Sequence, residues 1–222
     1  HIGFVRERFQ KEHRYIYRQV SYDHEPVFAV GSMLSIENCF SVLAIIDMAE
    51  KMGLDVMSAG VALAWATEAT EKGLISEQET VVRLTFGDAE AYKEAMLYLG
   101  KGTNEFYRIM AQGTLKAAEK FGGKDYACVL GQEMAGYATG EVYFASQALG
   151  LRHSHLDSGG YSYDQKEKGK DVRKAIDFLI KDEQGRALLT SMVACLFARG
   201  VYTDELLSTC LKSVGYGFLA DN

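Results

Sequence analysis

The chain has 222 residues, of which 48% are hydrophobic and 24% are charged, so it has the composition of an ordinary globular protein and the length of one large domain or two small ones. This composition disfavours disorder, and no apolar run approaches the roughly 20 residues that span a bilayer, which disfavours membrane insertion. The net charge of -6 comes without a basic stripe, so we do not expect nucleic acid as a partner.

The cysteines stand far apart, at Cys39, Cys128, Cys195 and Cys210, and none belongs to a CxxC pair. We therefore expect neither a self-contained zinc site nor a redox site, and the simplest setting is a reducing cytoplasm. Because the chain begins at His1 and not at a methionine, we expect a truncated chain.

The first half of the chain has helical spacing behind a short extended segment. Alternating side chains from residue 15 to 22 predict a strand or extended arm before Pro26, the single proline. Apolar spacing then predicts a helix from Ser35, as its N-cap, to Met52, with Gly53 as its end.

The next helices follow from capping signals. Asp55 is the expected N-cap of a helix over 56–72, and Ser76 with Glu79 forms the capping box of a short helix over 77–84. The remaining predicted helices cover residues 89–99, with Gly100 as the end, and 103–121, 141–149, 170–181, 185–198 and 203–214.

Two stretches lack this regularity, residues 125–140 and the polar loop 152–169. We take the first of them as the boundary between two packed parts. The sequence thus predicts an all-α, multi-helical fold with two closely packed subdomains, residues 1–125 and 126–222.

The turn Glu50-Lys51-Met52-Gly53-Leu54-Asp55 departs from a plain pattern of amphipathic helices. A carboxylate on each side of a tight glycine turn, beside the free amides of a new helix, suits a polar heterocycle rich in N–H donors. The simpler interpretation is that Gly53 and Asp55 only cap their helices.

Other residues have the chemistry of a site but also plain alternatives. Residues 152–157 hold His153 and His155, which could bind metal, move protons or be surface histidines without a task. Glu25 lies in an aromatic-rich segment before Pro26, where it could hold a proton or belong to a solvated turn. Cys195 lies among apolar residues, so an inert buried thiol is its default interpretation.

Several enzyme motifs are missing: GxSxG, GxxxxGKS/T, HExxH and the Glu-x-x-His pair of di-iron bundles. Composition and spacing alone therefore predict a soluble helical protein and no specific activity.

Segments in the expected order over nearly the whole chain nevertheless resemble the aldehyde:ferredoxin oxidoreductase family. Residues 22–31 resemble its YE...ALG stretch, and residues 50–55, with Ser58 and Gly60 after them, resemble its DxxGLD pterin motif and following S.G. Three later segments also match, namely 131–133 with KG.E, 145–153 with S.RG..H, and 195–197 with the C.F ending of the second pterin motif.

The resemblance implies roles for particular residues. Glu25 and His153 fall on the active-site glutamate and histidine of the family. The cofactor-binding turn then comprises Glu50, Gly53, Leu54 and Asp55, and Cys195 is the last ligand of a 4Fe-4S cluster.

The sequence also departs from the family pattern. Glu50 replaces the first Asp of its motif, and residues 190–195 keep Cys195 but lack the Asp, Gly and Leu of the second DxxGLC, so the second pterin contact is in doubt. Leu130 stands in place of Lys, and residues 138–141 replace DPR, which points to a different substrate.

In the family, a β-rich pterin-binding domain and a CxxCxxxC segment precede the part that matches residues 1–31, and this sequence contains neither. The resemblance implies the C-terminal helical portion of a tungsten (or molybdenum) bis-pterin, iron–sulfur enzyme that oxidises small aldehydes to carboxylic acids. Its partners would be ferredoxin or another iron–sulfur acceptor and the N-terminal portion. This chain alone would hold no cofactor and be inactive, and the alternative is a non-catalytic helical scaffold or interaction module.

Overall fold

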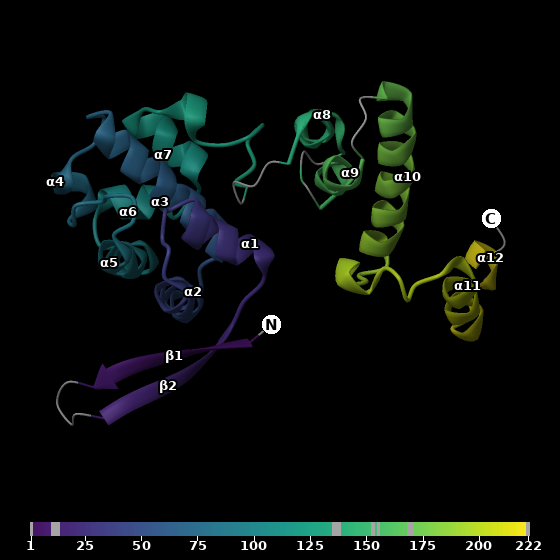
Figure 1. The fold of residues 1–222 in the computed structure, drawn as a ribbon, viewed down its shortest axis with the longest axis horizontal. Helices are drawn as coiled ribbons and strands as arrows, with labels where there is room; N and C mark the ends of the chain where they lie inside the picture. Colours follow the sequence, from purple (N-terminus) through teal and green to yellow (C-terminus); the bar gives the residue numbers. More distant parts are fainter. Residues whose placement is uncertain are drawn as a thin grey trace. The chain divides into compact units, whose positions relative to one another are not determined.

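The computed structural model describes residues 2–9, 14–134, 139–151, 154, 156–167 and 171–220. The chain forms two compact units, His1–Tyr137 and Ala138–Asn222 (Figure 1). The division falls within the irregular 125–140 stretch, C-terminal to the boundary expected after residue 125. Across the described ranges the structure is helical apart from one hairpin and an isolated bridge, so the all-α prediction is confirmed. No helix of these ranges is long and apolar enough to cross a membrane.

The first unit begins with a two-stranded antiparallel hairpin where the sequence predicted a single extended segment. Strand β1 (Ile2–Phe9) pairs with β2 (Arg14–Ser21) in the register that sets Ile2 opposite Ser21. The hairpin lies against α2. The helical elements in the described residues of this unit are α1 (His24–Val27), the π-helix η1 (Phe28–Ser32), α2 (Cys39–Met52), α3 (Val56–Glu71), α4 (Glu77–Thr80), α5 (Ala89–Lys101), α6 (Glu105–Met110), α7 (Thr114–Phe121) and the 3-10 helix η2 (Lys124–Tyr126).

Helix starts agree with the capping signals at two of the three predicted sites. Asp55 caps α3, and Ser76 with Glu79 forms the capping box of α4, as predicted. Ser35 is not the cap of α2. It has a φ of 58°, and Asn38 caps the helix instead, with its Oδ1 accepting from the amides of Phe40 and Ser41 at 2.9 and 3.2 Å.

One predicted helix is divided in the structure, and one predicted helix end was wrong. The single helix expected over 103–121 is divided into α6 and α7 at Gly113, whose φ is 119°. Gly100 does not end α5, which continues to Lys101 and ends at the left-handed Gly102. Gly100 is needed inside the helix because a Cβ there would lie 2.4 Å from Met52 Cβ on α2.

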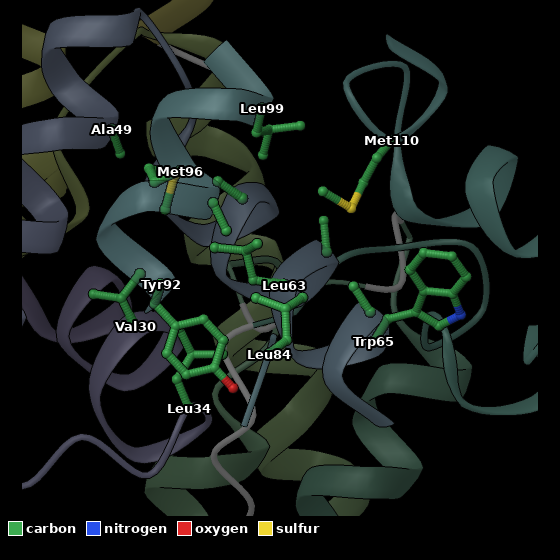
Figure 2. Packing of buried hydrophobic residues seen from close by; sticks show 14 of the residues in the cluster. Val30, Leu34, Ala49, Leu63, Trp65, Leu84, Tyr92, Met96, Leu99 and Met110 are labelled. Carbon is green, nitrogen blue, oxygen red and sulfur yellow. The ribbon is translucent and has the colours of Figure 1, made fainter. Parts of the chain in front are cut away.

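The core of the first unit gathers side chains from α2, α3, α5 and α6 (Figure 2). Trp65 stacks on Phe106 with their ring centroids 6.1 Å apart, and its Nε1 donates to Gly122 O. The buried Tyr92 hydroxyl lies 2.8 Å from Thr67 Oγ1, which itself donates to Leu63 O. The polar atoms of Trp65, Tyr92 and Thr67 in this core are therefore hydrogen-bonded.

Tyr92 should make the first unit sensitive to alkaline pH. Burial raises the pKa of Tyr92 to about 12, and the hydrogen bond with Thr67 acts in the opposite direction. In the unfolded chain the phenol ionises near pH 10, so the free energy of unfolding should fall as the pH rises from about 10 to 12. Urea unfolding at pH 9 and 11 should show a smaller loss for Tyr92→Phe than for the wild type. An equal loss in both proteins would contradict this assignment.

The second unit is built on one long helix. Its elements are α8 (Glu141–Leu149), α9 (Gly160–Lys166), α10 (Val172–Ser191), the 3-10 turn η3 (Leu196–Ala198), α11 (Asp204–Ser213) and α12 (Gly217–Ala220). The two helices predicted over 170–181 and 185–198 are wrong, since α10 runs through Gly185, where nothing forces a break. The predicted loop 152–169 also contains α9, whose Asp164 accepts from the amides of Val142 and Tyr143 at the start of α8.

Candidate functional site

The turn between α2 and α3 is held by its backbone. Gly53 ends α2 with a φ of 69°, its amide donates to Glu50 O at 3.1 Å, and the Leu54 amide donates to Ala49 O at 3.0 Å. Asp55 Oδ1 then accepts from the Ser58 amide at 2.7 Å. The capping interpretation of Gly53 and Asp55 is therefore correct.

Gly53 and Asp55 also line a cavity of about 340 Å³ within the first unit. This volume is at the lower end of the range for small-molecule sites. The residues that line it are Gly53, Leu54, Asp55, Ser58, Ala59, Ala62, Leu99, Met110, Ala111, Gln112, Gly113 and Glu133. Leu99 and Met110 belong to the core cluster and are labelled in Figure 2, so one wall of the cavity is the outer edge of the hydrophobic core.

A second helix start lines the same cavity. Gly113 precedes α7 and offers no side chain as a cap, and Glu133 Oε1 accepts from the Thr114 amide at 2.5 Å. Asp55 and Glu133 thus each use one carboxylate oxygen on a helix amide. Within the described residues, neither second oxygen forms a hydrogen bond or ion pair. A helix N-terminus favours negative charge, so both carboxylates are stabilised where they stand.

Glu50 is placed differently from the rest of its motif. It lies on the last turn of α2, its side chain is exposed, and it is not among the residues that line the cavity. Its backbone oxygen accepts from Gly53, so its contribution in this structure is to the turn itself.

Glu25 is not among the residues that line the cavity, but the segment that carries it packs against α3. It lies in α1, which continues into η1, and both contact α3. The approach is close because a Cβ at Gly60 would lie 2.6 Å from the backbone oxygen of Ala29. Gly60 therefore fixes the segment that carries Glu25 directly against the helix that Asp55 begins.

Of the two site residues predicted in the second unit, the structure describes only Cys195. His153 lies outside the described residues, as do Arg152 and His155. Cys195 follows α10 and precedes η3, and it is exposed, so the default interpretation as a buried thiol is wrong. Among the residues that the structure describes, no three His, Cys, Asp or Glu side chains form a group able to hold a metal ion.

Sequence reasoning did not select Glu133, Ser58 or the 111–113 segment as site residues. Residues 131–133 were matched with the KG.E element of the family, which was the available signal for Glu133. Nothing in the local sequence indicates that residues 111–113 line the cavity, because their place depends on the break between α6 and α7.

Comparison with known proteins shows the family of this chain. The family described as "Aldehyde ferredoxin oxidoreductase, domains 2 & 3" matches residues 5–218. The tungsten-containing aldehyde ferredoxin oxidoreductase of Pyrococcus horikoshii is 25% identical over 219 residues, covering 90% of this chain and 35% of that protein. The corresponding Pyrococcus furiosus protein is 25% identical over 217 residues, with the same coverage.

A relative with a different printed activity also matches. The aliphatic sulfonate oxidoreductase, WOR-like subunit, of Pyrococcus furiosus is 26% identical over 191 residues, covering 86% of this chain and 27% of that protein. The chain spans about a third of the length of the aldehyde ferredoxin oxidoreductases that it matches, 35% in the case of the P. horikoshii protein. Since the family match extends over nearly the whole sequence, the chain belongs to the aldehyde ferredoxin oxidoreductase family and corresponds to its domains 2 and 3.

Proposed function

We propose that this chain forms helical walls of a tungsten- or molybdenum-pterin site in an oxidoreductase that converts small aldehydes to carboxylic acids. Electrons would pass to ferredoxin or another iron–sulfur acceptor. The observation that carries the proposal is the cavity at the start of α3, where Gly53, Leu54 and Asp55 meet the edge of the core. These are three of the four residues that the family resemblance assigns to cofactor binding.

The residues of the cavity fit a pterin. A pterin is a flat heterocycle with N–H donors along one edge, and the second carboxylate oxygen of Asp55 is an acceptor of the right kind. Leu54, Ala59 and Met110 offer apolar surface for a ring face. Gly53 has no atom within 4 Å of its missing Cβ, which leaves room beside the turn.

The metal-pterin group supplies the two-electron chemistry when it is bound. Aldehyde oxidation with water also releases protons, and a positioned carboxylate or imidazole can accept them. We assign this task to Glu25, which α3 holds through the contact between Gly60 and Ala29, and to His153 on the family resemblance.

Cys195 is proposed as the one ligand that this chain gives to a 4Fe-4S cluster. Its exposed position after α10 leaves the thiol accessible to a group outside the second unit. Such a cluster takes four thiolates, so the other ligands have to come from the N-terminal portion of the enzyme. This dependence is why we expect the isolated chain to be inactive.

Asp55→Asn tests the proposal. Asparagine is as good an N-cap as aspartate, so α3 should keep its start, whereas the charged acceptor for pterin N–H groups is lost. In the complete enzyme we expect the pterin to dissociate roughly tenfold faster or more. Pterin is measured by the fluorescence of its oxidised form, and tungsten and molybdenum by elemental analysis.

The matched control is Asp88→Asn. Asp88 caps α5 by accepting from the Ala91 amide at 3.0 Å and does not line the cavity, so its variant should hold pterin like the wild type. A complete enzyme that contains neither pterin nor either metal would contradict the proposal and favour the alternative, a non-catalytic helical scaffold that keeps the fold.

A further inference from the structure

The cavity is lined by a second carboxylate, that of Glu133, to which the family resemblance assigns no role. Glu133 lines it from a segment far from α3 in the sequence. We propose that Glu133 is a positioning residue that holds the edge of the bound heterocycle together with Asp55. This inference rests on the proposed function, since it concerns the same cavity.

A tight hairpin turn sets the place of Glu133. The Val129 amide donates to Gln132 O at 3.0 Å, and the Gln132 amide donates to Val129 O at 2.8 Å. Leu130 and Gly131, between them, have φ values of 50° and 80°. Positive φ at both central residues is the geometry of a type I′ turn, and it is strained for leucine. The backbone therefore fixes the position of the residue that follows the turn.

Glu133 is then anchored at one oxygen. Its Oε1 accepts from the Thr114 amide at 2.5 Å, across 19 residues of sequence. Glu133 lies beside Gly113, where a Cβ would be 3.8 Å from this same oxygen, an ordinary van der Waals distance. The anchor limits the rotation of the carboxylate and leaves Oε2 for another donor.

The carboxylate of Glu133 is available to a ligand because no cationic side chain of the described residues pairs with it. Within the described part of the chain, Glu133 forms no ion pair with a lysine or arginine. The half-buried Cys128 lies within electrostatic range of Glu133, and burial, followed by the charge of Glu133, raises the pKa of that thiol. The neighbour is thus a neutral thiol near pH 7, and the carboxylate faces the cavity without a counter-ion.

Two helices of the described ranges are capped by a carboxylate from a separate segment. Asp164 uses both of its oxygens on amides of α8, whereas Glu133 uses Oε1 alone on α7. Asn38, Asp55, Asp88 and Asn104 each cap the helix that directly follows them. In α7 the cap comes instead from a separate, strained turn and stands on the wall of the cavity. Asp55 and Glu133 then present two acceptor oxygens to one space, which suits a heterocycle with several adjacent N–H donors.

Glu133→Gln is the test, because glutamine keeps an Oε1 acceptor for Thr114 but loses the charge. In the complete enzyme, pterin should be released roughly tenfold faster than from the wild type, as measured by fluorescence of the oxidised pterin during dialysis. The far-UV circular dichroism of the complete enzyme should stay unchanged, which shows that α7 keeps its start and separates a ligand contact from a structural cap. Glu119→Gln, on the exposed face of α7, is the matched control and should release pterin at the wild-type rate.

The outcomes are distinct for the two proposals. If Asp55→Asn releases pterin faster while Glu133→Gln does not, Glu133 is only a cap and this inference is overturned. If neither variant changes the release, the cavity is not the pterin site and the proposed function fails with it. Should the glutamine variant unfold, Glu133→Asp keeps the charge but shortens its reach. Faster pterin release would then support the inference, and a wild-type rate would overturn it.

Discussion

Replacing Glu25 by glutamine in the complete enzyme should lower the turnover number for aldehydes by about a hundredfold, the usual contribution of a positioned general base. Glutamine is nearly isosteric, so α1 and its contact with α3 should persist, and only the capacity to take up a proton is removed. The measurement is aldehyde-dependent reduction of a viologen dye, with tungsten and pterin contents determined on the same samples.

Glu37→Gln provides the matched control for Glu25. Glu37 is exposed in the connection between η1 and α2, and its variant should turn over aldehydes normally. A Glu25→Gln enzyme with full cofactor and normal turnover would show that Glu25 has no part in proton transfer. Lost activity together with lost pterin would instead mean that Glu25 supports cofactor binding.

Gly60→Ala should destabilise the first unit by about 1–3 kcal/mol, in the range expected for overpacking a close-packed interior. The added Cβ would lie 2.6 Å from the backbone oxygen of Ala29 and 2.9 Å from its Cβ, and backbone cannot move aside as a flexible side chain can. Either η1 or α3 must shift. Because η1 continues α1, the shift should also displace Glu25, and turnover should fall in the folded variant.

Gly185→Ala is the contrasting substitution. Gly185 also lies inside a helix, but nothing stands within 4 Å of its missing Cβ. Alanine should there stabilise the helix by about 0.5–1 kcal/mol. Chemical unfolding followed by circular dichroism measures both variants. The close-packing argument would be refuted by a Gly60→Ala protein as stable as the wild type.

The sequence predicted those helix starts and ends that depend on interactions between neighbouring residues. The caps at Asp55 and Ser76 and the end of α2 at Gly53 depend on hydrogen bonds within a few residues, and the structure has all three. The break at Gly113 and the unbroken helix through Gly185 were not predicted. Glycine permits either outcome, and in one case the chain turns to line a cavity whereas in the other it meets no neighbour.

The residues of the candidate site also differ in whether local sequence could indicate them. Gly53, Leu54 and Asp55 could be selected from the sequence because they are contiguous and belong to one motif, and all three line the cavity, while their part in cofactor binding stays a prediction. Glu133 reaches it from another segment by way of two strained turn residues, an arrangement that no periodicity indicates. The roles of Glu25, His153 and Cys195 stay predictions, because they depend on a cofactor that these residues would share with another part of the enzyme.

Trp65 is the single tryptophan of the chain, and it is buried in the first unit between Phe106 and the carbonyl of Gly122. Excitation at the long-wavelength edge of protein absorption, where tryptophan absorbs and tyrosine does not, therefore gives emission from residues 1–137 alone. Comparing its emission with circular dichroism, to which the helices of both units contribute, would show whether the two units unfold together or one after the other. The protein thus contains its own optical label for the half that holds the Asp55 cavity.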